Sequence, residues 1–407
     1  MEIFKSNKNN AEVFDYENFD YEKCLSEVLE SVKKPNIMIC GSSGVGKSSL
    51  INDIFGTHVA EVGNSGVSTT RGIHEYKGET INLFDTEGFE IGREEVAARH
   101  IFNRLNNKEQ IASNDFENRI HEVWYCINGG SKRFLDFDKE EICKIRDKNI
   151  PVMIVITKID TLSEDELIAL KNEIAYVLPS IPSIFSYSTN SQFVQELKAA
   201  GIYKKFVQRD EMVKWAIDHL DEALREGFVP SLRSSLAIRR NYIISTIVKK
   251  YSTMAGAVVI GTSFINVPFS DSVPLMSLQV KMAMSIINAY GIKSDVSKLV
   301  GNLIGTTGVS YFGRTLASQL ISVIPFIGNT AKASVNTTVA VTITGSLGAA
   351  ITLVCEQYLK ACIKNNGANN LPFSDFLTVE NLKRAISFVQ KNKSDFGISD
   401  TDKKHNA

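Results

Sequence analysis

One segment constrains the fold of this chain more than any other. Residues 41–48 read GSSGVGKS, which fits the pattern GxxxxGK[ST], and they follow the apolar run Asn36–Cys40. A phosphate group needs many hydrogen-bond donors in a small space, so such a loop must turn tightly, and its three glycines permit that turn. A helix expected at Leu50–Phe55 adds the positive end of its dipole. The pattern predicts a phosphate-binding loop between a strand and a helix. A glycine-rich surface turn is the alternative.

The loop residues have distinct expected roles. Lys47 would bridge the β- and γ-phosphate oxygens of a nucleotide, and Ser48 would ligate Mg²⁺. We expect the whole segment to contact the nucleotide, namely Gly41, Ser42, Ser43, Gly44, Val45, Gly46, Lys47, Ser48 and Ser49.

Apolar runs and helical stretches alternate as far as about residue 203. This alternation predicts an α/β fold of the P-loop NTPase kind, a mostly parallel sheet with helices on both faces. Ligands of such sheets bind at the carboxyl ends of the strands. The expected strands are Asn36–Cys40, Ile81–Phe84, Glu122–Ile127, Val152–Ile156 and Ile184–Tyr187. The expected helices between them are Arg93–Leu105, Asp138–Asp147 and Ser163–Val177.

A DxxG motif, Asp85-Thr-Glu-Gly88, closes the strand expected at Ile81–Phe84. The Asp85 carboxylate can hold the Mg²⁺ shell through water, and Gly88 can offer its N–H to a γ-phosphate. The motif alone is a weak signal, but its spacing after a phosphate loop is the spacing that a GTPase requires.

A candidate switch segment, Ser68–Arg71, lies between these two motifs in a glycine-rich stretch. A threonine there can place its hydroxyl on Mg²⁺ only while the γ-phosphate is present, which would order the segment. We choose Thr70, with Thr69 as the alternative and a plain turn as the other interpretation. Together with Lys47 and Gly88, Thr70 completes the expected catalytic set.

Thr157-Lys158-Ile159-Asp160 follows the strand expected at Val152–Ile156. Asp160 can accept from both N1–H and the exocyclic amine of guanine, and adenine would leave this carboxylate unpaired. Lys158 would lie across the base, and Ser188 would support the guanine carbonyl. The alternative for Asp160 is a helix N-cap. The expected ligands are therefore GTP or GDP with Mg²⁺.

With these motifs, residues 35–205 resemble the Era-like branch of translation-factor-class GTPases, because GSSGVGKSSLIN is close to its bacterial members. Many members carry Asn where this chain has Gly44, so the resemblance puts potassium activation in doubt. Phe89 follows the DxxG motif where Ras-like proteins place a water-orienting glutamine. The candidates for that task are Glu87, Arg71 and an arginine from a partner. We expect slow GTP hydrolysis that a partner, or a homodimer formed through G domains, accelerates.

Charge divides the chain unevenly, although its net charge is −1. Residues 230–370 carry 12 Lys and Arg but 3 Asp and Glu, a local charge of +9, and the remainder carries 33 against 43, a charge of −10.

Ala333–Cys355 has 23 residues without a charge, enough at about 1.5 Å per residue to cross a bilayer core of about 30 Å. Gly345 and Gly348 favour close helix packing in lipid and in soluble bundles alike. Phe206–Phe228 reads as one amphipathic helix.

The region Leu220–Tyr358 is also similar to the uncharacterised YcjF-type domain that follows Era-like GTPase domains. The matching stretches are Asp221–Phe228, Val267–Asp271 with Leu278–Val280, and Ile321–Gly328. This resemblance implies membrane association through residues of about 230–370, at the cytoplasmic face. The alternatives are a soluble bundle that docks on a partner, an RNA- or ribosome-associated assembly factor that binds phosphates, and a scaffold that holds GTP without useful turnover.

The expected domains are an N-terminal helical extension (1–34), a G domain (35–205), an all-α hydrophobic domain (206–390) and a polar tail (391–407). A helix is expected near Tyr21–Lys34. The N-terminus has no apolar signal core, which favours a cytosolic location. The six cysteines form no CxxC pair, which argues against a zinc site and a disulfide framework.

Overall fold

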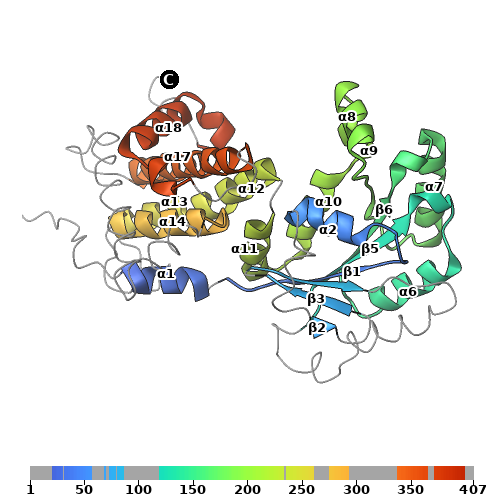
Figure 1. Cartoon of the computed structure of the whole chain (residues 1–407). Helices are drawn as coiled ribbons and strands as arrows, with labels where there is room; N and C mark the ends of the chain where they lie inside the picture. Colours follow the sequence, from blue (N-terminus) through green and yellow to red (C-terminus); the bar gives the residue numbers. More distant parts are fainter. Residues whose placement is uncertain are drawn as a thin grey trace, which may run out of the picture. The chain divides into compact units, whose positions relative to one another are not determined.

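The structure is a computed structural model that describes residues 21–30, 32–56, 68–69, 73–78, 80–86, 119–232, 235–260, 275–292, 337–364 and 371–398 (Figure 1). The chain divides into two compact units. The first, here the sheet unit, is Val32–Arg239; the second, here the helical unit, joins Met1–Ser31 to Arg240–Ala407. The predicted domain limits at 34, 205 and 390 stay predictions.

Strands of the described residues form one seven-stranded sheet in the order β2-β3-β4-β1-β5-β6-β7. β1 is parallel to both β4 and β5, and β5, β6 and β7 continue in parallel, whereas β2 and β3 are antiparallel. This arrangement confirms the predicted mostly parallel α/β fold. The strands are β1 (Asn36–Cys40), β2 (Ser68–Thr69), β3 (Ile73–Lys77), β4 (Asn82–Thr86), β5 (Glu122–Asn128), β6 (Val152–Thr157) and β7 (Ile184–Ser186).

Helices cover both faces of the sheet, as two neighbouring residues of β5 demonstrate. Successive side chains of a strand point to opposite faces. The buried ring of Trp124 stacks on Phe55 of α2 (Lys47–Phe55), with 5.7 Å between ring centroids. Tyr125 donates its hydroxyl to Asp138 of α6 (Asp136–Arg146) at 2.9 Å. Trp124 and Tyr125 therefore anchor helices on opposite sides.

The prediction of one helix over Phe206–Phe228 is wrong. The segment forms three helices, α9 (Tyr203–Phe206), α10 (Arg209–His219) and α11 (Glu222–Ser231). Leu220 is extended, with φ −79° and ψ 144°. The guanidinium of Arg225 donates to the carbonyl oxygens of Leu220 (2.6 Å) and Asp218 (3.1 Å) and so satisfies the end of α10. The apolar spacing continues through this break, so periodicity alone could not reveal it.

The region around the candidate switch segment contains strands that the sequence did not predict. Ser68 and Thr69 pair with Glu75 and His74 of β3, and β3 continues the sheet beside β4.

The first predicted helix, Tyr21–Lys34, is shorter in the structure, where α1 spans Tyr21–Glu30. The helix expected at Arg93–Leu105 lies outside the described residues. The part of the sheet unit that the structure describes also contains α7 (Glu164–Val177) and α8 (Ser191–Ala199).

The helical unit packs its described helices around α17 (Thr337–Lys364), with α13 (Lys249–Ile260), α14 (Leu275–Ala289) and α18 (Val379–Lys391) alongside it (Figure 1). At Gly348 the neighbouring helices leave no room for a side chain, because a Cβ there would lie 2.9 Å from Met282 Sδ and from the Val248 methyl carbons. α12 (Leu236–Tyr242) leads into α13 through a π-helical stretch, Ile243–Val248.

α17 is the helix of the described residues that is long and apolar enough to cross a membrane. The qualifying segment, Ala340–Lys364, has a mean hydropathy of 1.2 over its most apolar stretch, and 72% of that stretch is buried inside the unit. Mostly buried core helices of soluble proteins have the same length and composition, so α17 alone does not establish a membrane span. Two stretches that are similar to the YcjF-type domain, Val267–Asp271 and Ile321–Gly328, lie outside the described residues.

Candidate functional site

The predicted phosphate loop connects β1 to α2. Gly41, Gly44 and Gly46 have φ values of 133°, 69° and 109°, in the region that favours glycine. Gly41 is also restricted by space, because a Cβ there would lie 2.3 Å from the carbonyl oxygen of Cys126 in β5. The loop therefore lies directly against the neighbouring strand and needs glycine to do so.

Lys47 is the first residue of α2, and its side chain is buried. The ammonium group donates to the carbonyl oxygens of Gly41 (3.0 Å) and Ser42 (3.2 Å), so it lies folded over the loop. Burial raises the pKa of the Cys126 thiol to about 12, although the nearby Lys47 acts in the opposite direction. The neutral thiol therefore adds no negative charge that would compete with a phosphate for Lys47.

Ser48 and Asp85, the two predicted Mg²⁺ ligands beside the loop, lie next to each other. The Ser48 hydroxyl donates to Asp85 Oδ2 at 3.1 Å, and Ile39 of β1 pairs with Asp85 of β4. A hydroxyl and a carboxylate are the hard oxygen donors that Mg²⁺ binds together with water and substrate phosphates. The described residues contain no cluster of three or more His, Cys, Asp or Glu that could hold a metal. The Ser48–Asp85 pair fits a Mg²⁺ ion that a nucleotide brings with it.

Thr157 joins the phosphate loop to the predicted guanine loop. Its hydroxyl contacts the carbonyl oxygens of Val45 at 2.7 Å and Ile127 at 3.0 Å. Gly129, in the short helix η2 (Gly129–Ser131), packs behind it, since a Cβ there would lie 2.7 Å from the Thr157 carbonyl oxygen. The motif pattern indicated Thr157, but the bond to Val45 spans 112 positions and no local pattern reveals it.

Asp160 lies in η3 (Ile159–Thr161), next to the end of β7. The buried hydroxyl of Ser188 donates to Asp160 Oδ1 at 2.5 Å, and the amide of Asn190 donates to Oδ2 at 3.1 Å. Lys158 has a φ of 52°, and its side chain is exposed. The structure thus brings Asp160 and Ser188 together and adds Asn190, which the sequence analysis missed. The signal available in the sequence was the position of Asn190 as an N-cap before α8.

The remaining predicted site residues divide into two groups. Ser43 in the phosphate loop is exposed, as are Ser48 and Ser49 at the start of α2. Thr70 and Gly88 lie outside the described residues, as do Arg71, Glu87 and Phe89. The described part of the site therefore contains the phosphate loop, the Ser48–Asp85 pair and the guanine loop, and it lies along the carboxyl ends of β1, β4, β6 and β7.

Residues 36–158 match the family described as 50S ribosome-binding GTPase. No curated protein matches the chain. Among solved structures, similarity is found to a probable GTP-binding protein engB at 19% identity, over 47% of this chain and 99% of that chain, with a TM-score of 0.31. Era in complex with MgGDPNP and part of 16S ribosomal RNA matches at 21% identity, over 47% and 58%, with a TM-score of 0.30.

Translation elongation factor SelB from Methanococcus maripaludis matches at 19% identity, over 42% of this chain and 33% of that chain, with a TM-score of 0.29. Structural likenesses this distant carry no weight in assigning function. The family match and the geometry of the loops do, and they confirm the predicted P-loop GTPase class. The Era-like branch and the YcjF-type domain stay predictions.

Proposed function

We propose that this chain, which carries a GTP-binding P-loop G domain over residues 36–158, is a nucleotide-dependent switch. It binds GTP and GDP with Mg²⁺ and hydrolyses GTP slowly until a partner or a second copy assists. The observation that carries the proposal is the double contact of Thr157, which ties the phosphate loop at Val45 to the loop that presents Asp160. One ligand with a polyphosphate at one end and a guanine at the other fits that arrangement.

The chain's own residues supply binding and orientation. The N–H groups of the loop and the N-terminus of α2 favour phosphate oxygens, and Lys47 can leave the Gly41 and Ser42 carbonyl oxygens for them. Ser48 and Asp85 would hold Mg²⁺, which neutralises charge that develops on the phosphates. Thr70 and Gly88 are the proposed γ-phosphate sensors. Phe89, which stands where Ras-like proteins place a water-orienting glutamine, supports a low unassisted rate.

Asp160 and Lys158 are the proposed guanine readers, with Ser188 behind them. Asp160→Asn should exchange guanine for xanthine, because the new amide can donate to the xanthine oxygen that replaces the guanine amine. We expect fluorescent GDP to bind wild type and Asp160→Asn to bind xanthosine diphosphate instead. Lys47→Ala should weaken nucleotide binding by about 100-fold or more, a loss typical of a buried charged contact. Lys132→Ala, a surface lysine of the same domain paired with Glu166, is the control.

The slow rate is tested by measuring phosphate release against protein concentration. Turnover per molecule should rise as the protein is concentrated if G domains assist one another. Fast turnover by dilute protein without potassium would contradict the assisted mechanism. Absence of single-turnover hydrolysis at every concentration would favour a GTP-holding scaffold.

The proposed output of the switch is a membrane contact through residues of about 230–370 and the helices packed with them, at the cytoplasmic face. The basic character of that region supports it, because basic residues near an anionic lipid surface contribute about 1 kcal/mol each. The similarity to YcjF-type domains also supports it. Since most of the apolar stretch of α17 is buried, we place the contact on outer surfaces of the helical unit.

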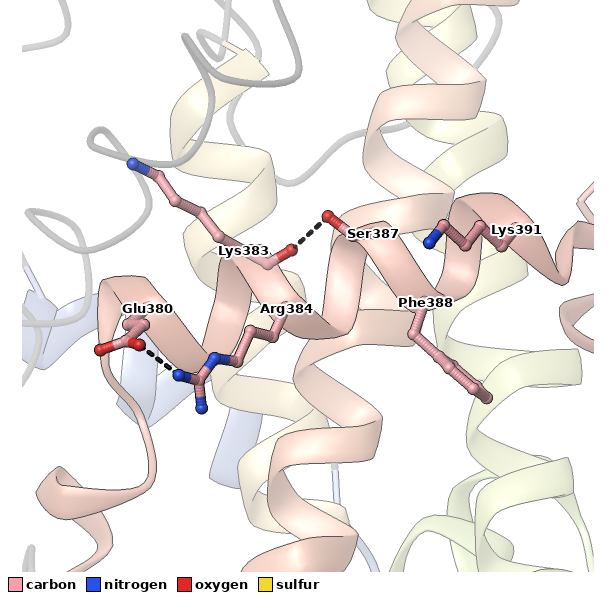
Figure 2. Close-up of a pocket in the computed structure, with 6 residues that line it drawn as sticks. All are labelled: Glu380, Lys383, Arg384, Ser387, Phe388 and Lys391. Atoms are coloured by element: carbon pink, nitrogen blue, oxygen red, sulfur yellow. Dashed lines mark hydrogen bonds and ion pairs between the residues drawn. The ribbon is translucent and has the colours of Figure 1, made fainter.

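α18 offers one such surface (Figure 2). Its inner face is buried, and its outer face holds Phe388 with 53% of the side chain exposed. Lys383, Arg384 and Lys391 lie along the same stripe, with Arg384 paired to Glu380. Cations flanking an exposed aromatic ring are typical of helices that lie on anionic bilayers.

Fractionation of cells with a carbonate wash tests the membrane contact. Retention in the pellet would indicate inserted helices, and release by carbonate would indicate a peripheral contact. Full solubility before the wash would contradict the membrane role. Equal membrane binding with GDP and with a nonhydrolysable GTP analogue would contradict the switch.

A ribosome- or RNA-associated assembly role is the second candidate, and the description of the matching family favours it. The +9 region would then bind phosphates of RNA. This role predicts RNA binding that falls steeply as salt rises. Cosedimentation with ribosomal subunits at two salt concentrations tests this role. Vesicle binding separates it from the membrane role, because an RNA-binding protein without a membrane role would bind neutral and anionic vesicles equally poorly.

A further inference from the structure

The base-reading carboxylate Asp160 is held on both oxygens. Ser188 donates to Oδ1 at 2.5 Å and Asn190 donates from Nδ2 to Oδ2 at 3.1 Å. Each carboxylate oxygen has about two lone-pair sites. Two sites are therefore occupied by the protein, and one on each oxygen remains for the two donors of a guanine edge.

Asn190 is itself fixed in orientation. Its Oδ1 accepts from the Phe193 backbone N–H at 3.2 Å, which caps α8, so its Nδ2 must face Asp160. Its backbone N–H donates to the Ser188 hydroxyl at 3.1 Å, which directs the Ser188 proton toward Asp160. One residue thus orders both donors around the carboxylate.

The residues at the end of β7 are bonded to two neighbouring segments. Tyr187 donates its hydroxyl to the carboxylate of Asp53 in α2, and Arg209 donates to the Asp53 carbonyl oxygen at 3.0 Å. The Tyr187 carbonyl oxygen accepts from the Ile159 N–H at 3.4 Å. The loop that carries Ser188 and Asn190 is therefore tied both to the phosphate-loop helix and to the segment that carries Asp160.

We propose that Asn190 is a specificity-determining positioning residue, which holds Asp160 in the orientation that reads guanine and couples that orientation to the N-terminus of α8. The inference rests on the proposed guanine recognition by Asp160. Asn190 touches Asp160 and not, in this role, the base, so it acts through the carboxylate.

The test uses variants of the full chain that keep the α8 cap, because Asp and Ser cap helices about as well as Asn. Asn190→Ser removes the amide donor, and Asn190→Asp replaces it with a like charge facing Asp160. We expect fluorescent GDP to bind about five-fold more weakly to Asn190→Ser and about 30-fold more weakly to Asn190→Asp. Asn149→Asp adds the same charge to an exposed turn before β6, at the amino ends of the strands and away from the site at their carboxyl ends, and should stay within about two-fold of wild type.

A second background separates positioning from a structural role. In Asp160→Asn the side chain at position 160 is neutral and can donate to the carboxylate that Asn190→Asp introduces. The double variant should therefore bind xanthosine diphosphate at least as tightly as Asp160→Asn alone. Equal losses in both backgrounds, or GDP affinity within two-fold in Asn190→Asp, would overturn the positioning role. If Asp160→Asn itself fails to exchange guanine for xanthine, guanine reading by Asp160 is wrong and this inference falls with it.

Discussion

The sheet unit and the helical unit bury polar groups in different ways. In the sheet unit, buried polar side chains bond to main-chain atoms distant in sequence, as Thr157 does to Val45. In the helical unit such bonds stay within a helix or join two helices. Thr352 bonds to the Gly348 carbonyl oxygen at 2.8 Å, and Gln279 donates to Thr344 at 3.2 Å. Side-chain bonds to the main chain of another element fix the loops of a ligand site, whereas bonds within a helix or between the side chains of two helices leave close packing to set the geometry.

The largest expected effect tests how rigid the sheet unit is. Gly41→Ala would place a Cβ 2.3 Å from the Cys126 carbonyl oxygen at a φ of 133°. Both the loop and β5 meet there through their backbones, so neither can shift without a large loss of stability. We expect a loss of about 4 kcal/mol in the free energy of unfolding, with loss of nucleotide binding. Both tryptophans, Trp124 and Trp215, lie in the sheet unit, so their fluorescence in urea measures it.

Gly44→Ala is the matched control for that variant. It has a positive φ of 69° but nothing within 4 Å of a Cβ, so its cost should be about 1 kcal/mol. Similar losses in Gly41→Ala and Gly44→Ala would show that backbone strain, and not the contact with β5, makes glycine necessary at residue 41.

Gly348 is the glycine of the helical unit to compare with Gly41, because a Cβ at residue 348 would meet side chains and not backbone. Gly348→Val would crowd Met282 Sδ and the Val248 methyl carbons, which can shift in part. We expect a loss of about 3 kcal/mol, seen by circular dichroism as an earlier loss of helix, while the tryptophan fluorescence midpoint stays unchanged. Gly345→Ala, which meets the Ser252 hydroxyl at 3.3 Å and Ile398 Cγ1 at 3.8 Å, should change stability by less than about 1 kcal/mol. A shifted fluorescence midpoint in Gly348→Val would break the distinction between the units.

The two units also differ in how much of their structure could be predicted from the sequence. Motifs such as Gly41–Ser48 combine a strand, a turn and a charged residue within a few positions, so local chemistry revealed both the fold and the phosphate loop. Asn190 was missed because its partner Asp160 lies 30 positions away. The break at Leu220 was missed because the apolar spacing continues through it. In the helical unit, Ala333–Cys355 suggested lipid, but small and apolar residues serve a buried bundle equally well.

A buried carboxyl group in the sheet unit gives a pH dependence. Glu122 is fully buried, and desolvation raises its pKa well above the ordinary value, although the Trp124 N–H donates to it at 3.2 Å. A raised folded pKa means that the native state holds the proton longer. The stability it contributes is present below the unfolded carboxyl pKa and is lost as pH rises toward the folded value.

Glu122→Gln should remove this dependence, because the amide is neutral at every pH and keeps an oxygen for Trp124. Above the ordinary carboxyl pKa, wild type should lose stability relative to the variant as pH rises, by at most about 1.4 kcal/mol per pH unit. Urea unfolding followed by tryptophan fluorescence at three pH values measures the slope, and Glu173→Gln on the exposed face of α7 is the control. Parallel pH profiles for wild type and Glu122→Gln would mean that another group controls the slope.

The smallest expected effect is one that the two units should share, since helix caps are local. Ser163 accepts from the Glu166 N–H at 3.3 Å to cap α7, and Thr378 accepts from the Asn381 N–H at 3.2 Å to cap α18. Ser163→Ala and Thr378→Ala should each cost about 1 kcal/mol in the unit that holds the helix. Fluorescence should report the first and circular dichroism the second. A cost several-fold larger in the helical unit would mean that α18 is held by its cap more than by the buried face that packs on α17, and local bonds would then matter more in that unit than close packing does.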